Sequence, residues 1–408
     1  MSAIVFLSGC RGVIRKMSAF VAVVGILFGI VSPAEASCLW QTGQLPKGGI
    51  FLSVVPISIR AFSSSDIWAA NDADRSLLHW DGTQWSAVTI PVNTPPNTGL
   101  FARAVTGTSD NDLWIDATFL SQSNQYAKSL HFDGSHWTVT RMPSGYPSNQ
   151  ICPGQGDGPN ISSMQSFGLN DVWAAGIVCH VVSGQDIFVG ISEHWDGLRW
   201  KITLLADSLH VLPFGLPSEL SGTSDQDIWL LGEQSVIEHF DGHRWSISSR
   251  YGVFNALMEG VFAGAPDDAW VVGFIPKTGN PGSEPRSFAA HWNGIEWLQI
   301  PTPNVDGPTG QRSNDLHAVS GSAPNDVWAV GENDRHSSPP HGTTRLEVMH
   351  WNGSTWSDET MDQLGLGGFF SVVDLGRHDV WALGSDDPNS GGGNPIGSFR
   401  CSGVQRLP

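Results

Sequence analysis

Positive charge is scarce in this sequence. Among 408 residues, 21 lysines and arginines stand against 39 aspartates and glutamates, which gives a formal net charge of −18 at pH 7. Proteins that bind nucleic acids present a basic stripe to the phosphate backbone, so we expect no nucleic-acid partner. Charged residues make up only 15% of the chain, whereas 47 glycines, 25 prolines and 18 tryptophans are conspicuous. This composition favours short strands joined by turns.

The sequence also lacks a comfortable membrane span. Its apolar run over residues 19–31 is shorter than the roughly 20 residues that cross a bilayer. Basic residues precede the run, and Ala34-Glu35-Ala36 follows it as a small-x-small cleavage site. This order is typical of a secretory signal peptide. We therefore predict a signal peptide over residues 1–36, cleaved after Ala36, with export of the mature chain to the periplasm or out of the cell.

A second export signal competes with this one. Leu7-Ser8-Gly9-Cys10 resembles the lipobox of a lipoprotein. It stands before the basic residues Arg11, Arg15 and Lys16 and follows almost no apolar core. The order of these elements favours the signal peptide over a lipid anchor.

Two short signatures alternate along the mature chain, and such internal repeats are typical of propellers and solenoids. The first is Asp-apolar-Trp, found at Asp66-Ile67-Trp68, Asp112-Leu113-Trp114, Asp171-Val172-Trp173, Asp227-Ile228-Trp229, Asp268-Ala269-Trp270, Asp326-Val327-Trp328 and Asp379-Val380-Trp381. The second is His-aromatic-Asp/Asn-Gly-x-x-Trp, which begins at His79, His131, His194, His239, His291 and His350.

Each signature predicts a local structure. Asp-Gly or Asn-Gly between β-prone residues predicts a hairpin with a type I′ turn, which has positive φ at both central positions. The aspartate of the first signature follows turn residues, and we expect its carboxylate to cap the amides of that turn. Each unit of roughly 40 to 60 residues then contains four short antiparallel strands, which is the pattern of a β-propeller blade.

The last unit lacks its own second tryptophan, and the N-terminal segment supplies a candidate. Trp40 is followed by Leu45-Pro46 with the spacing that separates Trp85 from Ile90-Pro91. We predict an all-β, seven-bladed propeller of four-stranded antiparallel blades, formed by residues 37–408 as one domain. Residues 37–46 supply the outer strand of the last blade, which also contains residues 371–403.

Four cysteines remain in the mature chain, an even number that suits an oxidising compartment. Cys401 and Cys38 occupy the positions of Trp80 and Thr83, which we expect to face each other across the hairpin. A disulfide between Cys38 and Cys401 would then join the two ends of the ring. The other two cysteines, Cys152 and Cys179, belong to segments on the same face of the ring, and we predict a second disulfide between them.

These repeats resemble those of the bacterial neuraminidase-repeat-like propellers, a group that includes proteins similar to photosystem II stability and assembly factors. The resemblance covers nearly the whole mature chain, but it concerns the fold. Sialidase Asp-boxes read Ser/Thr-x-Asp-x-Gly-x-x-Trp, whereas here Asp81 and Gly82 are adjacent. The resemblance therefore implies a propeller and transfers no activity.

We expect the repeated histidines, aspartates and tryptophans to have structural roles. The six histidines belong to six different units, so they lie around a ring, and we expect each to bond within its own unit. The seven turn aspartates are likewise expected to be structural. All 18 tryptophans belong to the repeat: seven follow the turn aspartates, four precede Asp-Gly or Asn-Gly, and seven lie on the fourth strand, at Trp40, Trp85, Trp137, Trp200, Trp245, Trp297 and Trp356.

No catalytic, cofactor-binding or metal-ligating residue is predicted. The acidic, Gly-rich loops at 155–158 and 385–388 leave Ca²⁺ as an open alternative. Arg60 and Arg103, placed before inner strands of adjacent units, and His317 are mildly suggestive of a hydrolytic centre.

Variation in length is confined to segments expected on one face of the ring, at residues 119–128, 177–190, 276–286, 333–345 and 385–395. Variable loops on a rigid scaffold are the usual seat of binding. We therefore expect a monomeric, exported, non-catalytic binding or assembly scaffold that recognises a protein or a glycan. The alternative is an extracytoplasmic, sialidase-like glycoside hydrolase acting at the central channel, which two carboxylates about 5 to 9 Å apart beside clustered arginines would favour.

Overall fold

The computed structural model describes the backbone at residues 39–44, 58–70, 75–93, 98–120, 125–145, 150–153, 158–206, 219–232, 235–250, 254–277, 284–304, 312–335, 343–360, 367–376, 379–386 and 397–402. The chain divides into two units, residues 1–36 and residues 37–408. The predicted signal peptide lies outside the described residues. None of the helical turns within these ranges is long and apolar enough to cross a membrane.

The described chain forms four-stranded antiparallel sheets, which we call blades 1 to 7 in chain order. Blade 1 contains β2 (Ser58–Ser63), β3 (Asp66–Ala70), β4 (Ser76–Trp80) and β5 (Trp85–Thr89). Blade 2 contains β6 (Gly99–Ser109), β7 (Asp112–Leu120), β8 (Gln125–Phe132) and β9 (Trp137–Thr140). Blade 3 contains β10 (Asn160–Gly168), β11 (Asp171–Val182), β12 (Gln185–Trp195) and β13 (Trp200–Leu204).

Blade 4 contains β14 (Leu220–Ser224), β15 (Asp227–Gly232), β16 (Val236–Phe240) and β17 (Trp245–Ser249). Blade 5 contains β18 (Leu257–Ala265), β19 (Asp268–Ile275), β20 (Arg286–Trp292) and β21 (Trp297–Ile300). Blade 6 contains β22 (Arg312–Ala323), β23 (Asp326–Arg335), β24 (Thr343–Trp351) and β25 (Trp356–Asp358). Blade 7 contains β26 (Gly367–Asp374), β27 (Val380–Asp386), β28 (Gly397–Ser402) and β1 (Leu39–Gln44).

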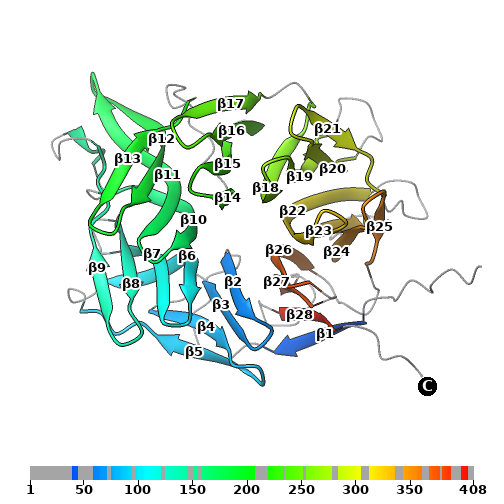
Figure 1. Ribbon diagram of the computed structural model, residues 1–408, viewed down its shortest axis with the longest axis horizontal. Helices are drawn as coiled ribbons and strands as arrows, with labels where there is room; N and C mark the ends of the chain where they lie inside the picture. Colours follow the sequence, from blue (N-terminus) through cyan, green and yellow to red (C-terminus); the bar gives the residue numbers. More distant parts are fainter. Residues whose placement is uncertain are drawn as a thin grey trace, which may run out of the picture. The chain divides into compact units, whose positions relative to one another are not determined.

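The blades follow one another around a ring. The first strand of each blade lies nearest the middle (Figure 1) and contacts the first strands of the two neighbouring blades, in the cycle β2, β6, β10, β14, β18, β22, β26 and back to β2. Serine and threonine hydroxyls on these strands reach the backbone of the next blade. The amide of Val105 donates to the hydroxyl of Ser58 at 3.1 Å, and the amide of Ser166 donates to Thr106 at 2.9 Å. Hydrogen bonds from polar side chains of the inner strands therefore link neighbouring blades at the middle of the ring.

Blade 7 is built differently from the others. β1 pairs with β28 so that Trp40 lies opposite Cys401, and Figure 1 shows the blue β1 beside the red β28. The other six sheets are each made of four strands that follow one another in the chain. The predicted count of seven blades is corrected to six complete blades of consecutive strands and one composite sheet, in which β1, from the predicted N-terminal segment, is the outer strand beside β28.

The predicted opposition of Cys38 and Cys401 is wrong in its register. In the hairpin of blade 1, Trp80 lies opposite Trp85 and not opposite Thr83. The same register places Trp40, rather than Cys38, opposite Cys401. Cys38 lies outside the described residues, so the disulfide between the chain ends stays a prediction.

The Asp-Gly and Asn-Gly turns are not type I′ turns. In blade 1, Gly82 has a φ of 91°, but Asp81 is not among the residues with positive φ. Four residues separate the paired Trp80 and Trp85. The carboxylate of Asp81 accepts hydrogen bonds from the amides of Thr83 at 2.8 Å and Gln84 at 2.9 Å. The aspartate stabilises a four-residue loop through its side chain, and glycine alone takes the left-handed conformation.

The turn aspartates bond chiefly to side chains. Six of them accept a hydrogen bond at 2.7 to 3.0 Å from Nε2 of the histidine that begins the second signature in the same blade. That imidazole lies against the tryptophan of the first signature, with ring centroids 4.2 to 4.5 Å apart. The predicted capping of turn amides is confirmed in blade 2, where the amide of Thr108 donates a hydrogen bond to Asp112 at 3.3 Å. The two signatures thus join the second and third strands of each blade.

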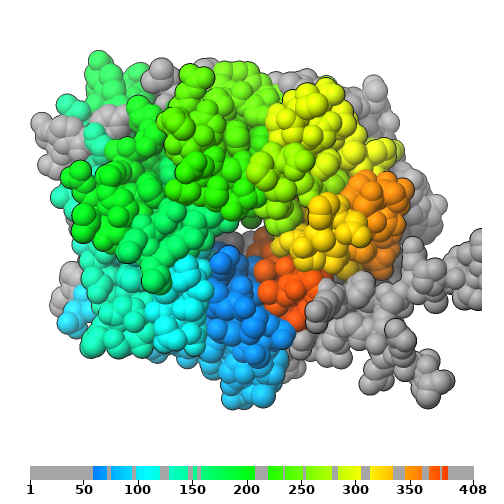
Figure 2. Space-filling view, viewed as in Figure 1, coloured from blue at the N-terminus to red at the C-terminus, as the bar shows by residue number. Residues whose placement is uncertain are grey.

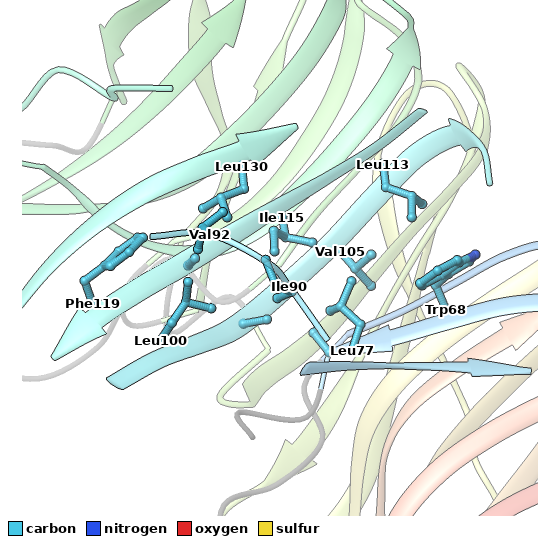
Figure 3. Packing of buried hydrophobic residues seen from close by; sticks show 13 residues of the cluster. Trp68, Leu77, Ile90, Val92, Leu100, Val105, Leu113, Ile115, Phe119 and Leu130 are labelled. Atoms are coloured by element: carbon cyan, nitrogen blue, oxygen red, sulfur yellow. The ribbon is translucent and has the colours of Figure 1, made fainter. Parts of the chain in front are cut away.

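Apolar side chains fill the space between neighbouring blades. Between blades 1 and 2, Trp68 and Leu77 pack against Leu113, Ile115 and Leu130 (Figure 3). All but Trp68 in this group are completely buried. A sheet covered on both faces explains why the strands show apolar residues at successive positions instead of strict alternation.

The structure contains a disulfide between Cys152 and Cys179, with the two Cα atoms 5.5 Å apart. It joins the connector before blade 3 to β11. The amide of Cys152 also donates to the carbonyl of Cys179 at 3.3 Å. The bond therefore holds an otherwise irregular segment against the edge of a blade.

Candidate functional site

Five inner strands contain an extra residue in their first half. The register of β6, β10, β18, β22 and β26 against the next strand skips one residue, which is respectively Arg103, Ser162, Glu259, His317 and Phe370. Such β-bulges turn a side chain away from its regular direction and are common beside functional sites. Here they bring unlike side chains to the middle of the ring.

Glycines allow four of these bulges. Gly176, Gly273, Gly331 and Gly384 lie on the second strand, directly beside the bulge of the first. A Cβ atom on Gly331 would lie 1.8 Å from the carbonyl oxygen of Asp315. Each glycine stands three residues after the tryptophan of the first signature. The Trp-x-x-Gly spacing is therefore a sequence signal for these bulges, and the two repeated signatures described above do not include it.

The inner strands enclose a central cavity of about 610 Å³, lined by residues from all seven blades. Figure 2 shows the hollow in the middle of one face, between the blue, green and yellow segments. Several lining groups serve the scaffold. Gln165 exchanges two hydrogen bonds of 2.9 Å with the backbone of Gly222, and Glu219 accepts one from the amide of Val261 at 2.9 Å. Burial raises the pKa of Glu219 to about 8, although this hydrogen bond opposes the shift.

One side of the cavity is formed by three bulge residues in contact. Nδ1 of His317 makes a short hydrogen bond with the carboxylate of Glu259 in the neighbouring blade. On its other side the imidazole stacks on Phe370, with centroids 4.9 Å apart and planes at 25°. Nε2 of His317 is buried and has no hydrogen-bond partner among the described residues. The imidazole is thus held in place from two blades, with one nitrogen uncommitted.

Asp315 adds a second carboxylate to this group. One donor atom from each of Glu259, Asp315 and His317 lies within 4.8 Å of the other two. Burial, followed by the negative charges of Glu259 and Glu332, raises the pKa of Asp315 to about 7. Burial alone would lower the pKa of His317, but the hydrogen bond and charge of Glu259 outweigh it and raise the pKa. We call Glu259, Asp315 and His317 the acidic–histidine cluster.

Arg60 lines the cavity from blade 1. Blades 4 and 5 stand three and four places farther around the ring, so Arg60 faces the side that carries Glu219 and Glu259. Its guanidinium lies over the ring of Phe62, 5.5 Å from the centroid. Nε of Arg60 is buried without a hydrogen-bond partner in the described part of the chain, and burial lowers the pKa of the group. This cation faces the cavity, and no anion among the described residues pairs with it.

Of the residues that the sequence suggested for a centre, the structure places Arg60 and His317 at the cavity, and it separates the repeat residues from it. The six repeat histidines and their aspartates lie within the blades, and the arrangement does not bring them together. Arg60 and Arg103 lie inside β2 and β6, not before them, and Arg103 donates to Asn160 at 3.1 Å. The suggested Ca²⁺ loop at 155–158 falls almost entirely outside the described residues, as do the side chains of 385–388. A second group of potential metal ligands, at Cys152, Cys179 and Asp186, is explained by the disulfide.

The molecule thus belongs to the all-β propellers, with a polar and electrostatically uneven central cavity. No protein-family model matches the sequence, and no curated protein matches it either.

Solved structures do match. The photosystem II assembly factor YCF48 bound to D1 peptide has a TM-score of 0.54 at 14% identity, covering 91% of this chain and 100% of that one. YCF48 from Cyanidioschyzon merolae has a TM-score of 0.52 at 13% identity, with 88% and 98% covered. Virginiamycin B lyase from Staphylococcus aureus has a TM-score of 0.51 at 11% identity, with 89% and 99% covered. The resemblance to assembly-factor propellers is confirmed for the fold, and at these identities for the fold alone.

Proposed function

We propose that this chain is an exported, non-catalytic propeller that recognises a protein partner at the central cavity. The observation that carries the proposal is the Arg60 guanidinium, which faces a cavity of about 610 Å³ and has no ion pair or hydrogen bond within the described residues. Arg60 is half-buried and its Nε is fully buried, and a desolvated charge without a partner is unfavourable. A carboxylate supplied by a partner would satisfy it through paired, charge-assisted hydrogen bonds.

The position of the cluster within its strands indicates the end of the cavity at which a partner would enter. Glu259 and Asp315 lie near the beginning of β18 and β22. Connectors from the preceding blade arrive at this end, and the variable loops between second and third strands emerge on the same face. A chain segment inserted there would meet Arg60 with its acidic groups while the loops contact the body of the partner. The peptide bound to YCF48 is a precedent for peptide recognition by a propeller of this fold.

A sialidase-like hydrolase has less support. Among the described residues that line the cavity there is no tyrosine, and Arg60 is the only arginine. The donor atoms of Glu259 and Asp315 lie within 4.8 Å of each other, short of the separations used by glycosidases. The required convergence of arginines, a tyrosine and an acid is therefore missing from the described cavity wall.

The test is binding of fluorescent peptides from a library of acidic sequences, each compared with its Asp→Asn and Glu→Gln version. We expect the wild-type chain to select acidic peptides and Arg60→Ala to weaken their binding at least tenfold. Arg60→Lys should recover part of the loss, because it keeps the charge but loses the planar fork. Arg244→Ala, at an exposed arginine in the hairpin loop of blade 4, is the matched control.

Equal binding by wild type and Arg60→Ala would overturn the proposal. A parallel array of neutral and acidic glycans decides the class of partner. Arg60-dependent binding of glycans in the absence of peptide binding would overturn the assignment to a protein.

A further inference from the structure

The acidic–histidine cluster concentrates negative charge around one imidazole. Besides Glu259 and Asp315, the charge of Glu332 also acts on Asp315 and His317. Glu347 is fully buried within reach of the backbone amide and the charge of Asp315, and neither of its carboxylate oxygens makes a well-formed hydrogen bond. Carboxylates gathered in this way repel one another unless a proton or a cation lies among them.

Donor atoms in the cluster remain unused by the protein. Oδ1 of Asp315 and Nε2 of His317 are both buried, and neither has a hydrogen-bond partner among the described residues. Buried polar atoms in proteins are nearly always satisfied, and an ion is one of the groups that satisfies them. Asp315 and His317 are separated on β22 by Leu316 alone. The bulge at His317 brings the imidazole toward Glu259 on β18.

We propose that Glu259, Asp315 and His317 bind one divalent transition-metal ion at the wall of the central cavity. One imidazole nitrogen and two carboxylate oxygens suit Zn²⁺ or Mn²⁺, whereas Ca²⁺ and Mg²⁺ prefer oxygen ligands alone. The ion takes the place of the proton between Nδ1 of His317 and the carboxylate of Glu259, Oδ1 of Asp315 is the third ligand, and Nε2 of His317 keeps the ring proton. Three protein ligands leave positions that face the cavity, where water or another ligand completes the shell.

The scaffold fits this role because the ligands come from two blades. The inner strands of blades 5 and 6 are in contact, and Phe370 of blade 7 supports the imidazole from behind. Binding therefore links two blades across their interface, and a bound ion stabilises the folded chain in proportion to its affinity. This inference does not depend on a peptide partner, since the ion is bound by residues of this chain alone.

Isothermal titration tests the proposal, with the purified chain free of any histidine tag and first stripped of metal by a chelator. We expect wild type to bind one equivalent of Zn²⁺ or Mn²⁺ and to unfold at a higher temperature in its presence. Asp315→Asn and His317→Gln should each weaken binding at least tenfold. Ser162→Ala, which changes the equivalent bulge residue of blade 3, should bind like wild type.

Circular dichroism establishes that each variant is folded before it is titrated. Asp315→Asn preserves the size of the side chain and serves if His317→Gln does not fold. The absence of 1:1 binding by folded wild type overturns the proposal, as does unchanged affinity in folded Asp315→Asn. Binding of Ca²⁺ in preference to both Zn²⁺ and Mn²⁺ overturns the assigned class of metal.

Discussion

Nε2 of His131 lies 2.7 Å from Oδ1 of Asp112, and the imidazole stacks on Trp114 with centroids 4.2 Å apart. The same three-way contact recurs in the other five complete blades. In blade 2 the aspartate side chain is only 4% exposed, whereas Asp66 in blade 1 is 24% exposed. Asp112 also accepts a hydrogen bond of 2.6 Å from the hydroxyl of Thr108. The carboxylate thus joins the turn to the third strand, and the imidazole that it orients lies against Trp114, which packs against the next blade.

The first prediction follows from this difference in burial. Asp112→Ala removes a nearly fully buried carboxylate and both of its hydrogen bonds, to His131 and to Thr108, and such a loss costs about 2 to 3 kcal/mol of unfolding free energy. Asp66→Ala should cost about 1 kcal/mol, because water reaches the site and replaces part of the lost bonding. Urea denaturation of both variants checks the order. Equal costs, or a larger cost for Asp66→Ala, would contradict the role of burial.

The disulfide of blade 3 gives the second prediction. Cys152 and Cys179 are both buried and close a loop with a sequence separation of 27. Replacing both with alanine should lower the unfolding free energy by about 3 to 4 kcal/mol, from the loop-closure entropy that the bond removes from the unfolded chain. Denaturation without reductant measures the effect. A midpoint equal to that of wild type would mean that the backbone contact between Cys152 and Cys179 alone holds the connector.

The repeat made the architecture predictable, while the cavity was largely hidden from the sequence. Asp112 and His131 recur at regular offsets in blade after blade, so their structural role follows from counting. Glu259 and His317 occupy equivalent bulge positions, yet no spacing between them in the sequence signals that they meet, because their contact depends on two adjacent blades. The predicted turn type was also wrong. Asp-Gly suggested a two-residue turn, but the carboxylate of Asp81 stabilises a four-residue loop between Trp80 and Trp85.

The third prediction concerns pH. Burial, followed by the negative charge of Asp116, raises the pKa of Glu193 in the folded chain to about 9, whereas its ordinary value is 4.5. Between these values the unfolded chain releases a proton that the folded chain keeps. The free energy of unfolding therefore falls as pH rises from about 4.5 to about 9, by at most roughly 1.4 kcal/mol per pH unit from this group.

Glu193→Gln removes that contribution while keeping the size of the side chain. We expect its stability relative to wild type to increase steadily from pH 5 to pH 8, as measured by urea denaturation at each pH. The exposed Glu296→Gln is the control, and its difference from wild type should stay flat over the same range. A pH-independent difference for Glu193→Gln would show that Glu193 keeps the same protonation in both states.

The fourth prediction tests whether the glycine beside a bulge determines the cavity wall. Gly331→Ala places a Cβ atom 1.8 Å from the carbonyl oxygen of Asp315, so the backbone of β22 must move. We expect a loss of about 2 to 4 kcal/mol in unfolding free energy, in the range of severe overpacking. Because the displaced segment carries Asp315 and His317, affinity for Zn²⁺ or Mn²⁺ should fall with it. Gly232 also stands three residues after a tryptophan, but among the described residues its added Cβ would lie no closer than 3.5 Å to any neighbour. Gly232→Ala should therefore change stability by less than about 0.5 kcal/mol and leave metal affinity intact, and a similar loss in both variants would contradict a specific role for the glycine beside the bulge.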